Sequence, residues 1–271
     1  RYKEKFSDGE TIVNEPNTSE TLADGTVKTL IYTVYGPKSA MELYHYQKGK
    51  LEYQIADLYV RDIEKLAANY LTSGTKMIYE YAHEINARIA INTDYFRDNA
   101  KNEGLIIRNA KLIQSKPCKF SDLCVVFQDG TVRCYDCKAE QIDNDAIIAN
   151  YPYHAFYFGP SLLDADGNAK TVFNSTLNPK NPRTVFGYYE PGHYAFICVL
   201  GDRSMKDIND KPLGKGKSPG MNFEELSALC ASLGMKAAYN LDGGGSSGMY
   251  WNDQLFGHNS RGMGDILAII D

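Results

Sequence analysis

Short apolar segments of strand length, separated by turn residues, recur along most of this chain and limit the folds it can adopt. The turn pairs Asp129-Gly130 and Asp166-Gly167 punctuate these segments, as expected for hairpins and tight loops. Alternating or continuous apolar patterns predict strands at residues 29–35, 89–91, 104–113, 123–135, 184–189, 194–200 and 266–270.

Two segments break this pattern with helical spacing. Apolar residues recur at helical intervals within residues 76–87. The second predicted helix covers residues 223–233: Asn222 is a suitable N-cap, Glu225 completes a capping box, and Gly234 stops the helix. Each predicted helix is followed by a short strand. The pattern therefore predicts an α+β fold, with mixed, largely antiparallel sheets flanked by helices in a single compact domain.

Residues 1–50 are expected to form an N-terminal arm or added strands, and residues 51–271 the main domain. With 271 residues, 43% of them hydrophobic, the chain can bury a substantial core. Its net charge of -5 argues against non-specific nucleic-acid binding. No apolar stretch approaches the roughly 18 residues that a membrane span needs. Because the sequence begins with Arg1 rather than Met, we expect a preceding segment: a signal peptide, an anchor or more of a longer chain.

The cysteines leave two interpretations open. Cys198 and Cys230 lie in apolar surroundings and are predicted to be core residues. The other four are predicted either to form one or two disulfides or to remain buried thiols, and their spacing is unlike that of common zinc sites. These four are Cys118, Cys124, Cys134 and Cys137.

Two predicted strands end in the same polar pattern, Asn92-Thr93-Asp94 and Asn240-Leu241-Asp242. Residues two apart in a strand face the same side, so each end presents an amide and a carboxylate together. Asn and Asp also simply begin turns. The repetition of the pattern favours a functional site built from both ends.

A triple glycine follows the second of these ends. Bare main-chain N–H groups of Gly243, Gly244 and Gly245, with the hydroxyls of Ser246 and Ser247, could converge on an anion. No Lys follows as in a phosphate-binding P-loop. The guanidinium groups of Arg183 and Arg261 are candidates for binding a phosphoryl group. No histidine cluster has metal-ligand spacing.

At these residues the sequence resembles the phosphodiester glycosidase family. The most specific segment is residues 218–247, which combine an S-x-G-M start, a helix, L-G and N-L-D-G-G-G-S-S. Thr93 stands where the family usually has glycine, and the order of 201–203 is altered from D-G-R. Further segments are similar to the family and follow one another in the same order as they do there: residues 90–96, 104–109, 158–160, 182–187, 201–203 and Arg261.

The resemblance implies hydrolysis of a sugar-1-phosphodiester at the anomeric C–O bond, releasing sugar and a phosphomonoester. Asp94, Asp242, Arg183 and Arg261 would be catalytic; Asn92, Asn240, the three glycines and the two serines would bind substrate, with no cofactor. The expected partner is a glycosyl phosphodiester or phospho-glycan, met outside the cell or at its surface.

Two alternatives stay open at this point. One is a non-catalytic module that binds a cell-surface phospho-polysaccharide. The other is a metal-dependent phosphodiesterase acting at phosphorus, with Asp94, Asp202 and Asp242 as oxygen ligands.

Overall fold

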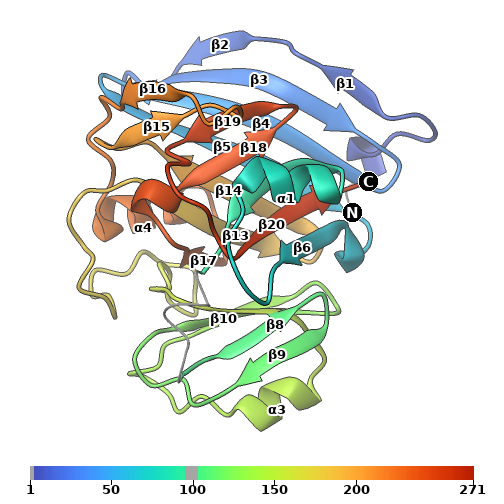
Figure 1. Ribbon diagram of the computed structural model, residues 1–271, viewed down its shortest axis with the longest axis vertical. Coiled ribbons are helices and arrows are strands. Elements are labelled where there is room, and N and C mark those ends of the chain that lie inside the picture. Colours follow the sequence, from blue (N-terminus) through green and yellow to red (C-terminus); the bar gives the residue numbers. More distant parts are fainter. Residues whose placement is uncertain (1–2, 95–102) are drawn as a thin grey trace.

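The computed structural model describes residues 3–94 and 103–271, and in this part of the chain every strand pairing is antiparallel. Three large sheets and one two-stranded ribbon form a single domain (Figure 1). The eight-stranded sheet has the order β1-β3-β4-β5-β14-β13-β17, with β2 also paired to β3. Its strands are β1 (Ile12–Asn14), β2 (Thr18–Thr21), β3 (Val27–Tyr35), β4 (Ser39–Lys48), β5 (Leu51–Val60), β13 (Arg183–Glu190), β14 (His193–Val199) and β17 (Ala237–Asn240).

Two five-stranded sheets complete the framework. The first has the order β19-β18-β7-β20-β6 and the second β11-β10-β12-β8-β9. The first comprises β6 (Leu66–Tyr70), β7 (Ala87–Asn92), β18 (Gly248–Trp251), β19 (Gln254–Gly257) and β20 (Asp265–Ile270). The second comprises β8 (Leu105–Arg108), β9 (Lys111–Ser115), β10 (Leu123–Phe127), β11 (Val132–Tyr135) and β12 (Pro152–Tyr157). The ribbon is β15 (Ser204–Lys206) with β16 (Pro212–Lys215).

All three sheets contribute one face to a shared core. Leu58 from the eight-stranded sheet, Ile91 from the first five-stranded sheet and Phe156 from the second are buried in the same apolar cluster. Strand β14 is buried on both faces, with Phe196 in this cluster and Ile197 in the next. This double burial explains the continuous apolar run at 194–200.

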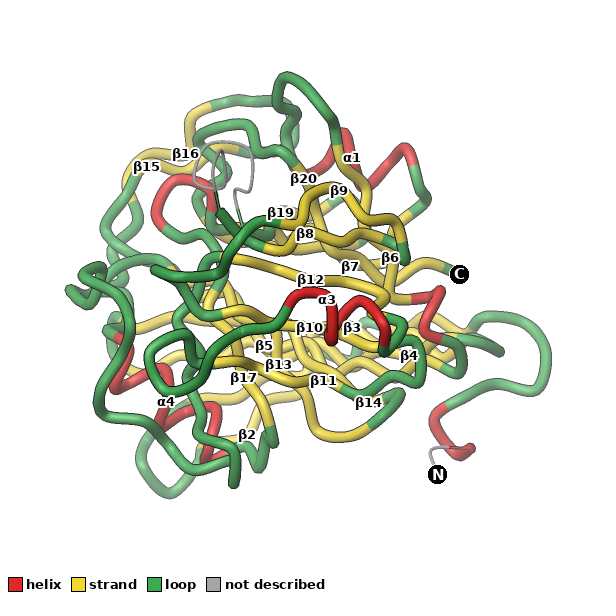
Figure 2. Tube along the Cα trace, turned by 90° about the horizontal axis from the view of Figure 1, so that it is seen from below, coloured by secondary structure: helices red, strands yellow, loops and turns green. Residues whose placement is uncertain are grey.

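Each sheet's other face is covered separately. Helix α4 (Phe223–Ser232) packs on the eight-stranded sheet, α1 (Ile78–Glu84) on the sheet with β7, and α3 (Asn144–Ala149) on the sheet with β10. Helices α1 and α4 lie at opposite edges of the molecule in Figure 2. Single helical turns occur at η1 (Lys3–Lys5), η2 (Ile63–Lys65) and η3 (Gly244–Ser246).

The structure confirms the largely antiparallel sheets and is richer in strands than a balanced α+β fold. Segment 104–113 is not one strand but a hairpin, turned at Asn109 and Ala110, which both adopt positive φ. Within residues 1–50, strands β3 and β4 belong to the eight-stranded sheet and supply Tyr32 and Met41 to the shared core. The boundary at residue 50 stays a prediction.

The six cysteines are free thiols, and Cys124 lies directly opposite Cys134 on β10 and β11. Cys198 and Cys230 are buried, as predicted. Within residues 3–94 and 103–271, no helix combines the length and apolar character needed to cross a membrane.

The cap of α4 forms as predicted and can be tested alone. Asn222 Oδ1 accepts from the Glu225 N–H at 2.8 Å, and the Glu225 carboxylate accepts from the Asn222 N–H at 3.1 Å. Replacing Asn222 with Ala should lower the free energy of unfolding by about 1 kcal/mol in urea titrations, whereas Asn222→Asp keeps an acceptor and should cost much less. Equal losses in the two variants would contradict this role for the cap.

Candidate functional site

The two polar strand ends meet in the folded chain, as the sequence predicts. The Asp242 N–H donates to the Thr93 carbonyl at 2.9 Å, and Asn92 Nδ2 donates to the Asp242 carbonyl at 2.6 Å. These bonds join the end of β7 to the residues that follow β17. The side chains of the four residues, Asn92, Asp94, Asn240 and Asp242, nevertheless point in different directions, so their roles differ.

Asn92 and Ser247 connect segments inside the protein. Asn92 Oδ1 accepts from Thr184 Oγ1 at 2.7 Å and from the Gly248 N–H at 3.1 Å. Ser247 Oγ lies 3.0 Å from Thr184 Oγ1. All three of these side chains are fully buried or nearly so. Their hydrogen bonds fix where the loop after β17 sits on β7 and β13.

Asp94 points into the protein interior, where it pairs with Arg108. Arg108 donates to Asp94 Oδ1 at 2.6 Å and to Asp265 Oδ2 at 2.7 Å, and all three residues are at most 1% exposed. Asp94 Oδ2 accepts from the Tyr157 N–H at 2.8 Å. Thr93, which stands where the family usually has glycine, donates its hydroxyl to Asp265.

This triad has one positive and two negative groups. Burial raises the pKa of Asp94 above its ordinary value, the Arg108 charge lowers it, and the Asp265 carboxylate raises it again. The Arg108 guanidinium also lies 4.3 Å from the centre of the Phe156 ring. The triad therefore ties β7, β8, β12 and β20 together beneath the strand ends.

Asp242, by contrast, is buried with its side chain 12% exposed and pairs with Arg261, which reaches the surface. Arg261 donates to Asp242 Oδ2 at 2.8 Å and to Ser246 Oγ at 2.6 Å, and its side chain is 48% exposed. Burial raises the pKa of Asp242, while Ser246, Arg261 and the Gly243 N–H favour the ionised form. A carboxylate and a guanidinium are thus paired where the triple glycine begins.

Most N–H groups of the triple-glycine turn bond within the protein. Gly243 N–H donates to Asp242 Oδ1 at 2.9 Å, and Gly244 N–H to the Pro182 carbonyl at 3.2 Å. The N–H groups of Ser246 and Ser247 donate to carbonyls within the turn. The predicted convergence of all these groups on an anion is therefore not the arrangement found.

Two arginines flank this turn instead. A Cβ on Gly244 would lie 4.0 Å from Arg203 Cζ, and a Cβ on Gly245 would lie 4.0 Å from Arg261 Cδ. Gly244 has a φ of +61°, a conformation that favours glycine. A Cβ on Gly245 would lie 2.6 Å from Ser260 Oγ, so this position has no room for a side chain.

Arg203 also lines a basic cavity of about 450 Å³ next to the turn. Lys180 and Lys215 line it as well, and Asp202 is its one acidic lining residue. Lys180 pairs with Glu225 and Lys215 with Asp202, whereas Arg203 bonds the neutral side chain of Asn181 at 2.9 Å. Among the described residues, no carboxylate pairs with Arg203.

Arg183 lies elsewhere, because side chains alternate along β13. Thr184 faces Asn92 and the shared core, so Arg183 faces the other side of the sheet. There its guanidinium lies 4.2 Å from the centre of the Phe223 ring and donates to the carbonyls of Leu177, Pro179 and Met221. Burial lowers the pKa of Arg183 to about 10, so it stays charged at neutral pH. The expected contact between Arg183 and a phosphate is replaced by these carbonyl contacts.

Asn240 is also turned away from the turn. Its Nδ2 donates to the Gly159 carbonyl at 2.8 Å, and its buried Oδ1 has no partner among the described residues. The structure thus brings together Asp242, Arg261, Ser246 and the three glycines, and places Asp94, Arg183 and Asn240 in other surroundings. Tyr95 and Phe96 of the 90–96 segment lie outside the described residues.

Sequence reasoning did not select Arg203 as a site residue. The altered turn at residues 201–203 was the one sequence feature that pointed to this position. An exposed arginine can be recognised as a site residue only when its neighbours in the fold are known. Here the neighbour is Gly244, more than forty residues later in the chain.

The three aspartates considered as metal ligands do not form a cluster. Asp94 pairs with Arg108, Asp202 with Lys215 and Asp242 with Arg261. Residues 3–94 and 103–271 contain no group of three or more His, Cys, Asp or Glu side chains placed to hold a metal ion. The donor set expected for a metal-dependent phosphodiesterase is thus not assembled by the described residues.

Comparison with known proteins identifies the family of the chain. The family model for phosphodiester glycosidases matches residues 85–270, and the chain belongs to this family. The match covers the strand ends, the triad, the triple-glycine turn and both flanking arginines. Family and fold together are those of a glycosidase-type enzyme.

Individual relatives are distant. The chain is 27% identical over 207 residues to the SPbeta prophage-derived uncharacterized protein YomE of Bacillus subtilis (strain 168), covering 74% of this chain and 30% of that protein. The chain thus spans less than a third of that relative's length.

Solved structures share the fold at low identity. The catalytic domain of zebrafish N-acetylglucosamine-1-phosphodiester alpha-N-acetylglucosaminidase, auto-inhibited by its pro-peptide, superposes with a TM-score of 0.61 at 16% identity, covering 98% of this chain and 86% of that one. A hypothetical protein from Synechocystis has a TM-score of 0.54 at 14% identity, covering 86% and 62%.

The buried triad predicts a pH-dependent stability defect. In Arg108→Met, two buried carboxylates lose their counter-charge, which should cost about 3–5 kcal/mol of unfolding free energy at pH 7. The pKa of Asp94, already raised by burial, should rise further above its ordinary value, so stability is retained at low pH and lost as pH rises through the folded-state value. Urea titrations at pH 5 and pH 8 should therefore show the larger defect at pH 8.

Arg88→Met is the matched control, because Arg88 pairs with Asp271 at the surface. Its removal should cost less than about 1 kcal/mol at either pH. A defect in Arg108→Met that is independent of pH would contradict the proposed electrostatic role.

Proposed function

We propose that this protein hydrolyses the anomeric C–O bond of a sugar-1-phosphodiester, releasing the free sugar and a phosphomonoester. The observation that carries the proposal is the triple-glycine turn, with Asp242 at its start and a guanidinium on each side. A substrate lying across this turn would meet a carboxylate next to groups that bind a negatively charged phosphate.

The two arginines suit the phosphodiester. Its two non-bridging oxygens share one negative charge, and a guanidinium binds such a pair with parallel N–H donors. Arg203 has no competing carboxylate among the described residues and lies beside the basic cavity. Arg261 lies between Asp242 and solvent, where it can contact the phosphate and still hold the carboxylate.

The reaction calls for this combination of groups. Breaking the C1–O bond builds positive charge at C1, which a nearby carboxylate stabilises. The electron pair of that bond moves to the phosphate oxygen, which is a weak base and needs electrostatic stabilisation more than protonation. Asp242 either attacks C1 or takes a proton from the attacking water. Both routes consume one water and release the sugar and a phosphomonoester, the first with retention and the second with inversion of the anomeric configuration.

Asp94 is assigned a positioning role in this proposal. It is completely buried and paired with Arg108, so it supports the strand end that carries Asn92 and Thr93. The substrate class follows the activity in the name of the zebrafish structural neighbour, so an N-acetylglucosamine α-1-phosphodiester is the first probe. The same proposal places the protein outside the cell or at its surface. It also takes a phospho-glycan as the natural substrate.

The assay is incubation with the methyl phosphodiester of α-N-acetylglucosamine 1-phosphate. Free N-acetylglucosamine should accumulate, and Asp242→Asn should lower kcat at least about 1000-fold, because the amide provides neither a nucleophile nor a base. In heavy-oxygen water the label should enter the sugar. Label in the phosphate would indicate attack at phosphorus. If glycosyl phosphodiesters bound saturably but none of them was hydrolysed, the protein would be a binding module instead.

The two arginine environments predict opposite phenotypes. Arg203→Gln should raise KM about tenfold with normal stability, because it removes a phosphate contact. Arg183→Met should lower the free energy of unfolding by about 2 kcal/mol, because it removes hydrogen bonds to buried carbonyls, and should leave kcat/KM of the folded protein within about threefold.

Arg133→Gln serves as the control for charge alone, because Arg133 pairs with Glu140 at the surface, away from the turn. If Arg183→Met raised KM and Arg203→Gln did not, Arg183 would be the phosphate ligand and our assignment would be wrong.

A further inference from the structure

His258 is a buried histidine next to the triple-glycine turn, and the mechanism above does not use it. It directly follows β19, and both of its ring nitrogens face main-chain groups. The Gly201 N–H donates to Nε2 at 3.0 Å, and Nδ1 lies 3.1 Å from the Ser204 carbonyl oxygen. These two contacts lie on either side of Arg203 in the chain. The imidazole therefore holds both ends of the Arg203 turn, residues 201–204.

The two contacts define the protonation state of the ring. A backbone N–H can only donate, so Nε2 must carry a lone pair. A carbonyl oxygen can only accept, so Nδ1 must carry the proton. A second proton would place an Nε2–H against the Gly201 N–H and break that hydrogen bond. His258 therefore holds the Arg203 turn at both ends only while its ring is neutral.

The main chain around His258 is attached to the triple-glycine turn. The His258 N–H donates to the Ser247 carbonyl at 2.7 Å, and the Ser260 N–H donates to the Gly245 carbonyl at 2.9 Å. Arg261 follows Ser260 directly. His258 thus belongs to the segment that carries one flanking arginine, and its ring bonds the turn that carries the other.

We propose that His258 is a positioning residue, which sets Arg203 relative to Arg261 so that both guanidinium groups contact one phosphodiester. Arg203 is exposed and bonds only to the neutral side chain of Asn181 among the side-chain contacts described above, so the placement of its turn decides where the guanidinium lies. The inference rests on the proposed function, because it adds a residue to that same site.

Charged groups near the ring act in both directions on its protonation. Arg203 disfavours the protonated form and Asp202 favours it, whereas Lys206 and Lys215 of the facing ribbon each pair with an aspartate. Burial is the largest effect and lowers the pKa of His258 below its ordinary value. The ring is therefore neutral at pH 7. As pH falls through the folded-state pKa, the ring gains a proton and releases one end of the Arg203 turn.

The first test is steady-state kinetics of the full chain with the methyl phosphodiester of α-N-acetylglucosamine 1-phosphate. His258→Phe keeps a planar ring but loses both contacts, and it should raise KM at least about tenfold while kcat changes less than about threefold. His258→Gln supplies an amide oxygen that can accept from the Gly201 N–H, so its KM should stay within about threefold of the unchanged protein. A normal KM in His258→Phe, or a His258→Gln variant as impaired as His258→Phe, would overturn the proposal.

The pH profile distinguishes positioning from simple packing. The KM of the unchanged protein should rise as pH falls from about 7.5 to about 5, and the rise should be smaller in His258→Gln, whose amide does not titrate. Asp242, paired with Arg261 on the other side of the turn, titrates in both proteins and so cancels in the comparison. Identical profiles would contradict the role of the neutral ring, and this comparison holds even if His258→Phe does not fold.

Nitrogen NMR tests the same contacts without any substrate. At pH 7 the His258 ring should be neutral, with its proton on Nδ1. A proton on Nε2, or on both nitrogens, would contradict the hydrogen bond from Gly201.

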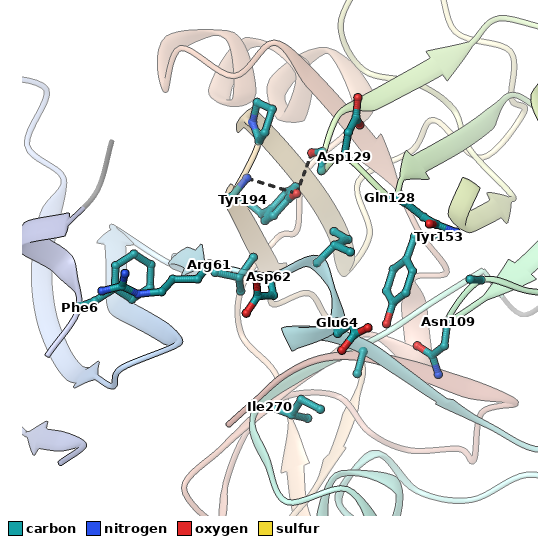
Figure 3. Close-up of a pocket in the computed structure, with 17 residues that line it drawn as sticks. Phe6, Arg61, Asp62, Glu64, Asn109, Gln128, Asp129, Tyr153, Tyr194 and Ile270 are labelled. Carbon is teal, nitrogen blue, oxygen red and sulfur yellow. Dashed lines mark hydrogen bonds between the residues drawn. The ribbon is translucent and has the colours of Figure 1, made fainter. Parts of the chain in front are cut away.

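Two variants serve as controls. His83→Gln removes an exposed histidine that pairs with Asp253. Glu64→Gln changes the lining of a separate cavity of about 1190 Å³, which no residue of segments 201–204 and 258–261 lines (Figure 3). Neither variant should change KM by more than about twofold, because neither contacts His258 or the turn.

Failure of the proposed function would give a different result. If the unchanged protein bound the diester without hydrolysing it, the hydrolase assignment would be wrong, and the same ratios would be expected in the Kd measured by calorimetry. If the unchanged protein hydrolysed the diester and His258→Phe had a normal KM, only the positioning role would be wrong. Absence of both binding and turnover would contradict both.

Discussion

The arrangement of the site depends on one buried guanidinium. Arg108, in β8, holds carboxylates from the end of β7 and the start of β20, strands that belong to a different sheet. Three buried charges of this kind are costly unless their geometry is right, so the triad specifies how two sheets meet. Asn92 and Thr184 then set the loop after β17 on that junction, and Arg261, paired with the buried Asp242, extends this arrangement to the surface.

Local signals were sufficient for the parts of the fold that are locally determined. The cap of α4 requires only Asn222 and Glu225, three residues apart, and the β10–β11 hairpin requires only its Asp-Gly turn. The hairpin at Asn109 was missed because neither Asn109 nor Ala110 is a glycine, although both adopt positive φ. The sharing of one core by three sheets depends on long-range packing, which no short pattern encodes.

The site shows the same division. The meeting of the two strand ends followed from their repeated pattern, and the family resemblance gave the correct family. The direction of each side chain did not follow, since it depends on distant partners. Asp94 faces inward because Arg108 and Asp265 are there, and Arg183 faces away because the neighbouring Thr184 bonds to Asn92.

The position of β20 also affects how the chain can be assembled. This strand lies between β6 and β7 and pairs with both, although it begins about 170 residues after β7 ends and about 195 after β6 ends. During synthesis on the ribosome, β6 and β7 must wait with open hydrogen-bonding edges until residues 265–270 emerge. Loss of residues 265–270 would therefore leave β6 and β7 without the strand that joins them.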